Sequence, residues 1–178
     1  KDDGSAVMVA EQFSTYESYY IDANGHGHTV THFVYSDIIV VNIDAEGNIN
    51  WASKIPKHQD SVGGGTYSSY ALATKGDKIY FVFNDSGKNL FVKPGDKINQ
   101  FELKGKDALV TLATVDGEGN VKREALFSPE HRDVILRPMD CVELSNEDMF
   151  IYASRKKDYR FGEIKYEYET SLKTKGLP

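Results

Sequence analysis

The chain has 178 residues, with 21 Lys and Arg against 27 Asp and Glu, which gives a formal charge of −6. This length suits one domain or part of a larger one, and a hydrophobic share of 40% excludes a wholly disordered chain. The acidic balance argues against nucleic-acid binding, no apolar run approaches the roughly 18 residues of a membrane span, and the single cysteine, Cys141, excludes a disulfide framework.

Strand patterns dominate the chain. Short β-branched and aromatic runs, bounded by clusters of Gly, Asn and Asp, are typical of strands. In chain order these runs are 6–13, 38–43, 49–55, 70–73, 78–83, 108–115, 121–127, 141–144, 149–153 and 159–168. No segment of a dozen residues keeps a helical period, and Ser128 with Pro129 predicts one short turn at most. The sequence therefore predicts an all-β chain.

Two of the runs are apolar on both faces. Only Asn42 interrupts 38–43, and only two Thr residues interrupt 108–115. A sheet with one solvated face would alternate more regularly, so this pattern indicates antiparallel sheets stacked on sheets.

An internal repeat is present. The turn Asp-Ala-Glu-Gly-Asn-Ile at 44–49 matches Asp-Gly-Glu-Gly-Asn-Val at 116–121, which sets an offset of 72 positions. Further strand runs follow both copies in the same order, so each unit is expected to form four antiparallel strands. The predicted layout has units at about 34–85 and 107–155, flanking strands at 6–13 and 159–168, and an insertion at 86–106.

The turn motif carries a resemblance to known proteins. Asp-x-x-Gly-x-Ile-x-Trp at 44–51 resembles blades of β-propellers of the quinoprotein-like or WD-like type. Together with 49–56, the strand pattern over roughly 34–168 also resembles the C-terminal part of uncharacterised secreted or lipid-anchored proteins of Bacteroidota. The second copy departs from the motif, because Arg123 stands where the first copy has Trp51.

The resemblance implies a propeller segment of an exported, periplasmic or outer-membrane-associated protein, with a cytoplasmic setting left open. Propellers close with about four or more blades, and this chain offers two units and a remainder. We therefore expect it to continue into, or pair with, further blades, with 6–13 and 159–168 sharing a third partial unit. The alternative is a two-sheet β-sandwich.

A histidine cluster is the most prominent polar feature. His26, His28 and His32 fall on one side of an extended strand by the period of two, and three imidazoles can hold Zn²⁺ with an open position. The alternative is a polar, Gly-rich loop with exposed histidines.

Other polar patterns have simpler structural interpretations. The segments at 22–24 and 116–118 carry the alternating oxygens of partial Ca²⁺ loops, although turn chemistry explains both. Gly63–65 predicts a flexible connection, since no Lys-Ser/Thr follows as in a phosphate loop. The many tyrosines could form a protein or glycan contact surface.

No catalytic nucleophile pattern is present in the sequence, and Cys141 sits in an apolar strand run. We therefore expect a non-catalytic binding or scaffold module without a cofactor, contacting protein or glycan but not nucleic acid. The alternative is a glycan-processing or metal-dependent hydrolase that uses the His-rich loop with Zn²⁺ or Ca²⁺.

Overall fold

A computed structural model describes residues 3–93, 95–127, 135–145 and 147–166. These residues form antiparallel strands and two short 3-10 turns, which confirms the all-β prediction. The strands are β1 (Ala6–Ile21), β2 (Gly27–Ile43), β3 (Ile49–Ile55), β4 (Gln59–Val62), β5 (Ala71–Lys75), β6 (Lys78–Ser86), β7 (Ala108–Val115), β8 (Val121–Phe127), β9 (Ile135–Leu136), β10 (Val142–Glu143), β11 (Met149–Arg155) and β12 (Asp158–Ile164). The predicted turn at Ser128 and Pro129 lies outside the described residues.

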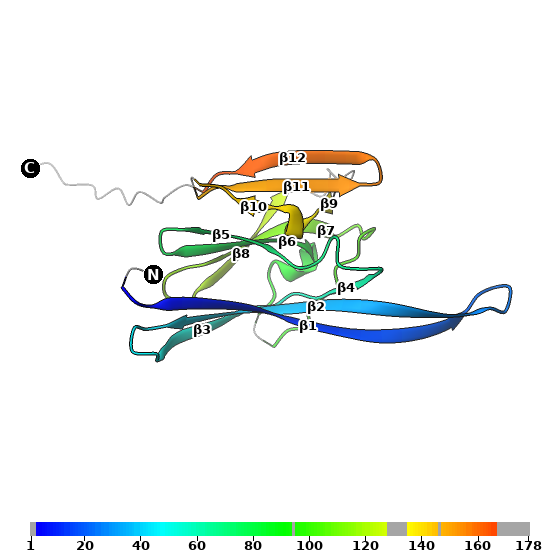
Figure 1. Cartoon of the computed structure of the whole chain (residues 1–178), viewed down its shortest axis with the longest axis horizontal. Coiled ribbons are helices and arrows are strands. Elements are labelled where there is room, and N and C mark those ends of the chain that lie inside the picture. Colours follow the sequence, from blue (N-terminus) through cyan, green and yellow to red (C-terminus); the bar gives the residue numbers. More distant parts are fainter. Residues whose placement is uncertain (1–2, 94, 128–134, 146, 167–178) are drawn as a thin grey trace, which may run out of the picture.

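The strands build three sheets that lie in layers (Figure 1). Sheet A has the order β1-β2-β3, with β4 beside β2; sheet B has the order β5-β6-β7-β8. Sheet C has the order β10-β11-β12, with β9 beside β11. Three sheets replace the two expected for a sandwich, so that alternative is wrong. The described part of the chain contains no helix long and apolar enough to cross a membrane.

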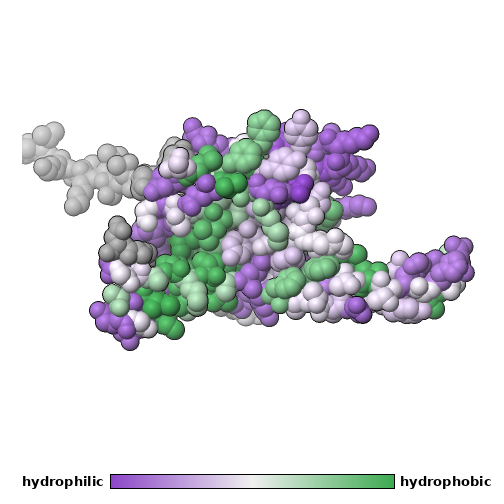
Figure 2. Space-filling view, in the orientation of Figure 1, coloured by the Kyte–Doolittle hydropathy of each residue, from purple (hydrophilic) through white to green (hydrophobic). Residues whose placement is uncertain are grey.

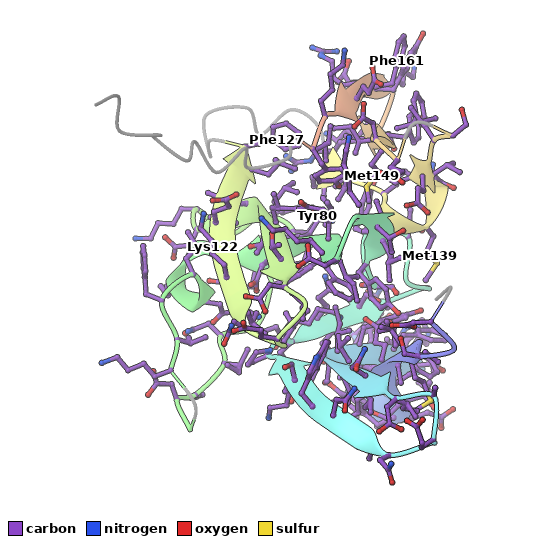
Figure 3. The ribbon with its side chains drawn as sticks, turned by 90° about the vertical axis from the view of Figure 1, so that its left-hand side faces the viewer. Tyr80, Lys122, Phe127, Met139, Met149 and Phe161 are labelled. Carbon is purple, nitrogen blue, oxygen red and sulfur yellow. The ribbon has the colours of Figure 1, made fainter. Side chains whose placement is uncertain are left out.

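Sheet B is the middle layer and is buried on both faces. From β6, Phe81 and Phe83 pack against sheet A, whereas Tyr80 and Val82 pack against sheet C. Figure 3 shows Tyr80 and Met149 between the middle and upper sheets. Successive side chains of a strand point to opposite faces, which explains why the central strands β6 and β7 of sheet B are apolar on both sides.

The predicted repeat units do not each form one sheet. The first unit contributes β2 and β3 to sheet A, then β5 and β6 to sheet B; the second contributes β7 and β8 to sheet B, then β10 and β11 to sheet C. The long connection inside each unit crosses between layers, so sheet B combines the end of one unit with the start of the next. The flanking strands do not meet, because β1 lies in sheet A and β12 in sheet C.

Both copies of the repeated turn have the same geometry. The backbone N–H of Asn48 donates to Asp44 Oδ1 over 2.7 Å, and that of Asn120 donates to Asp116 Oδ1 over 2.8 Å. Gly47 and Gly119 have φ values of 89° and 85°, in the left-handed region that favours glycine. A third hairpin uses the same turn, because Asp22 accepts the N–H of His26 over 2.9 Å.

The hairpin of β1 and β2 continues beyond the stacked sheets as a two-stranded arm (Figure 1). Glu11 pairs with Ile38 and Phe13 with Tyr35, so two residues of β2 oppose the single residue Gln12 at a bulge. We call residues 14–34 the arm. Its strands were expected to be shorter, since the sequence predicted only 6–13 and 38–43.

Candidate functional site

The arm carries a hydrogen-bonded polar cluster on the outer side of sheet A. Ser18 Oγ lies 2.8 Å from His32 Nε2, and His32 Nδ1 lies 2.8 Å from Asp60 Oδ1. The Tyr16 hydroxyl donates to Asp60 Oδ2 over 2.6 Å. We call these four residues the arm cluster; three come from the hairpin and Asp60 comes from β4, which pairs with β2.

The hydrogen bonds of the arm cluster fix its proton positions. The ionised carboxylate of Asp60 can only accept, so the Nδ1 atom of His32 carries a proton and donates to it. In the neutral ring Nε2 is then an acceptor, and Ser18 donates to it. Burial raises the pKa of Asp60, but the hydrogen bonds from Tyr16 and His32 outweigh it and hold that pKa below its usual value.

Ring stacking adds to the arm cluster. The rings of Tyr16 and His32 are stacked, with centroids 4.3 Å apart and planes 13° from parallel. Tyr20 and His28 form a second stacked pair, with centroids 5.2 Å apart. The anionic carboxylate of Asp60 accepts the hydrogen bond of the Tyr16 hydroxyl, and this contact raises the pKa of Tyr16. Two stacked pairs, Tyr16–His32 and Tyr20–His28, therefore lie on the outer side of the arm, and we call them the Tyr–His ladder.

The other two predicted metal ligands lie at the tip of the arm. His28 Nε2 is 3.0 Å from Asp22 Oδ2, and His26 Nδ1 is 3.5 Å from the same oxygen. The hydrogen bond with His28, together with those from the turn backbone, lowers the pKa of Asp22. The histidines thus use two different carboxylates, Asp22 at the tip and Asp60 beside β4.

The structure does not bring the three histidines together. A strand rises about 3.3 Å per residue, so His28 and His32 are about 13 Å apart along β2, too far to share one ion. Among the described residues, no group of three or more His, Cys, Asp or Glu side chains is placed to hold a metal. The Zn²⁺ hypothesis remains a prediction without a converging ligand set.

The remaining sequence candidates have structural positions. Asp22 and Asp116 cap turns with their carboxylates. Gly63–65 lies in the connection between β4 and β5. Cys141 is half-buried and precedes β10, and burial raises the pKa of its thiol, which disfavours the reactive thiolate.

A second polar cluster is buried between sheets A and B. Lys57 Nζ lies 2.6 Å from Glu11 Oε1 and donates to Gln59 Oε1 over 3.0 Å. Arg123 lies 3.6 Å from Asp85 and donates to the backbone oxygen of Pro56. Burial raises the pKa of Asp85 to about 6. These charged side chains link sheet A to sheet B and lie away from the surface that a ligand could reach.

Sequence reasoning missed Ser18 and Asp60 as members of the arm cluster, and it singled out Tyr16 only as one of the tyrosines that could form a contact surface. They are separated from His32 by 14 to 28 positions, and only strand pairing brings them together. A signal was present in the alternation of Tyr16, Ser18 and Tyr20, which places them on one face of a strand.

The arm also exposes large side chains. Tyr19, Tyr20 and Ile21 are each at least half exposed, and so is Phe13 at the base of the arm. In Figure 2 apolar side chains gather over the stacked sheets at the end away from the arm, whose tip is mostly hydrophilic. The arm therefore combines aromatic rings with polar groups, a composition common in contact surfaces.

Comparisons with known proteins identify no relative: no family model, no curated protein and no solved structure matches the chain.

Proposed function

We propose that this chain is a non-catalytic binding module in which stacked sheets of β-propeller type hold the arm as the contact element for a protein partner. The observation that carries the proposal is the arm itself, a hairpin that leaves the stacked sheets and exposes aromatic rings in a fixed ladder. Tyr side chains bring large contact area at a low cost in conformational entropy. An exported bacterial setting follows only from the sequence resemblance and is part of the proposal.

Cross-strand contacts support the proposal by fixing the base of the arm before it binds. A free two-stranded hairpin is marginally stable in water, but β4 pairs with residues 32–35 and Asp60 fixes both Tyr16 and His32. Preorganisation of this kind lowers the entropy cost of binding.

The test uses a random-peptide display library panned against the whole chain, with a glycan array in parallel. We expect peptides to be enriched on the chain and to lose binding at least tenfold in a Tyr19→Ser, Tyr20→Ser variant. Phe91→Ser is the matched control, because Phe91 is 86% exposed but lies outside the arm. Enrichment that survives loss of both tyrosines would contradict the proposal, and arm-dependent binding to the array alone would replace the protein partner with a glycan.

A second candidate function rests on the order of atoms in the arm cluster. Ser18, His32 and Asp60 follow the nucleophile, base and orienting acid of serine hydrolases, with both contacts at 2.8 Å. Successive amides of a strand point in opposite directions, however, so neighbouring N–H groups of β1 do not converge on an oxyanion. This geometry favours the structural role over catalysis.

A fluorophosphonate probe decides between these roles. Attack of Ser18 Oγ on phosphorus would expel fluoride, with the hydroxyl proton passing to His32, and would add the phosphonyl group to Ser18. We expect no labelling above that of a Ser14→Ala control. Labelling that disappears in both Ser18→Ala and His32→Ala would establish the hydrolase candidate instead.

A further inference from the structure

The outer face of sheet A is apolar over β1 and β2, with Lys54 of β3 beside Ile39 at its margin, and no described residue covers it. Val7 and Val9 pack against sheet B, so the alternate residues of β1 and β2 point away from it. We call this surface the outer face of sheet A; its members are Ala6, Met8, Ala10, Ile39, Val41 and Ile43. Met8 at its centre is 55% exposed.

The corresponding face of sheet B is buried along its central strands β6 and β7. The repeat offset of 72 places Val41 at the position of Ala113 and Ile43 at that of Val115, and both counterparts have no exposed surface. Met8 pairs with Val41 as Phe81 pairs with Ala113, and Phe81 is likewise fully buried. Sheet A covers that face of sheet B, so the outer face of sheet A has the pattern of a surface that another sheet covers.

The two repeated turns show the same difference between sheet A and sheet B. A Cβ atom placed on Gly119 would lie 2.7 Å from the indole ring of Trp51, which belongs to the neighbouring sheet. Gly47 has the same conformation at the equivalent position, yet a Cβ there would meet nothing within 4 Å. Sheet A therefore lacks the neighbour that sheet B has.

The outer face of sheet C is the opposite end of the stack. Met149 and Ile151 pack against sheet B, so Phe150 and Tyr152 point outward. Phe161 pairs with Tyr152, is 71% exposed and lies on the side of sheet C away from Met149 (Figure 3). This face presents large aromatic rings, whereas the outer face of sheet A presents aliphatic and small side chains.

We propose that the outer face of sheet C of one molecule docks onto the outer face of sheet A of a second copy, head to tail. This contact continues the order in which A packs on B and B packs on C within the chain. Bulky rings of Phe150 and Phe161 meet a face where Ala6 and Ala10 leave room, as complementary packing requires. The contact is heterologous, since two different surfaces meet, and it does not depend on what the arm binds.

Light scattering coupled to gel filtration tests the proposal with two blocking variants. Met8→Lys blocks the face of sheet A and Phe161→Lys blocks the face of sheet C; both positions are more than half exposed, so the fold should tolerate the change. We expect the unmodified chain to associate as concentration rises and each variant alone to be a monomer. An equimolar mixture should form a one-to-one dimer, because each variant keeps one intact face.

Phe91→Lys is the matched control and should associate like the unmodified chain, since Phe91 is exposed outside both faces. Circular dichroism checks that every variant keeps its strands. If the unmodified chain stays monomeric over the whole concentration range, the proposal that a second copy covers the outer face of sheet A is overturned. Association that persists in the single variants, or a mixture that stays monomeric, would overturn the head-to-tail arrangement.

Discussion

The indole of Trp51 lies directly over Gly119 and donates from Nε1 to the carbonyl of Gly117 over 2.9 Å. Ser53, two residues further along β3, donates to the carbonyl of Gly119. One strand of sheet A therefore holds the repeated turn of sheet B. The turn can accept the ring only because its glycine has no Cβ.

Gly119→Ala and Gly47→Ala measure this contact as a matched pair. Both substitutions force a residue with Cβ into the left-handed region, at a cost of about 1–2 kcal/mol. Only Gly119→Ala also displaces Trp51, which should add about 1–3 kcal/mol. Urea unfolding followed by circular dichroism gives the two values. In a Trp51→Ala background the difference should shrink to the cost of the remaining contact with Ser53 Oγ, which lies 3.0 Å from that Cβ position. Equal losses in the native background would contradict the inter-sheet contact.

The buried ion pair of Lys57 and Glu11 should matter far more than an exposed one. Lys57→Met leaves the carboxylate of Glu11 without its charged partner between the sheets, and such changes cost about 3–5 kcal/mol. Lys54→Met removes a pair with Asp37 whose lysine is 59% exposed, and should cost less than about 1 kcal/mol. Chemical denaturation of both variants checks this; a similar loss in each would show that burial does not set the cost.

Asp85 predicts a pH dependence of stability. Its pKa in the folded chain is about 6, above the ordinary value of 3.8, so the folded state binds more protons between these values. The contribution of Asp85 to the free energy of unfolding is therefore greatest below pH 3.8, falls as pH rises towards 6, and is constant above. The difference between the unmodified chain and Asp85→Asn should show this slope in unfolding curves. Asp158→Asn, at an exposed position, should leave the pH dependence of the free energy of unfolding unchanged. The same pH dependence in Asp85→Asn and in the unmodified chain would contradict the prediction.

Zn²⁺ should not bind the three arm histidines as one site, because Asp22 and Asp60 hold them at separate places. Isothermal titration should give no tight one-to-one binding, and His32→Ala should leave any weak heat unchanged. Tight binding that is lost in both His28→Ala and His32→Ala would restore the metal hypothesis.

Local patterns predicted most of the fold. Turns at 44–48 and 116–120 could be found because Asp, Gly and Asn at fixed spacing encode their own hydrogen bonds. The two-sided apolar run of β7 indicated stacking, and the structure buries Leu112 and Ala113 on opposite sides. These features depend on residues close together in the chain.

The number of sheets and the arm depended on distant residues. For His26, His28 and His32 the sequence left two alternatives open, an extended strand or a polar loop; residues 27–35 in fact pair with 13–21 along the whole arm. Thr, Val, Phe and Tyr at 29–35 favour a strand, but only pairing with distant residues fixes its length and register. The arm cluster could not be found for the same reason, since Asp60 reaches His32 only through the pairing of β4 with β2.

The bulge opposite Gln12 absorbs one extra residue of β2 and so keeps the side chains of the two strands matched along the arm. Before it, Ile38 and Val40 of β2 face sheet B; beyond it Tyr35 takes that direction, and His32 turns to the other side. Deleting a single residue at 36–37 would remove the bulge and make the alternation of β2 regular, so Phe13 would still pair with Tyr35 and the Tyr–His ladder would stay on its outer side. The change would instead remove the bend and the extra twist that a bulge gives to its strand. The direction in which the arm leaves the stacked sheets can therefore change without altering one residue of the ladder or of either hydrophobic core.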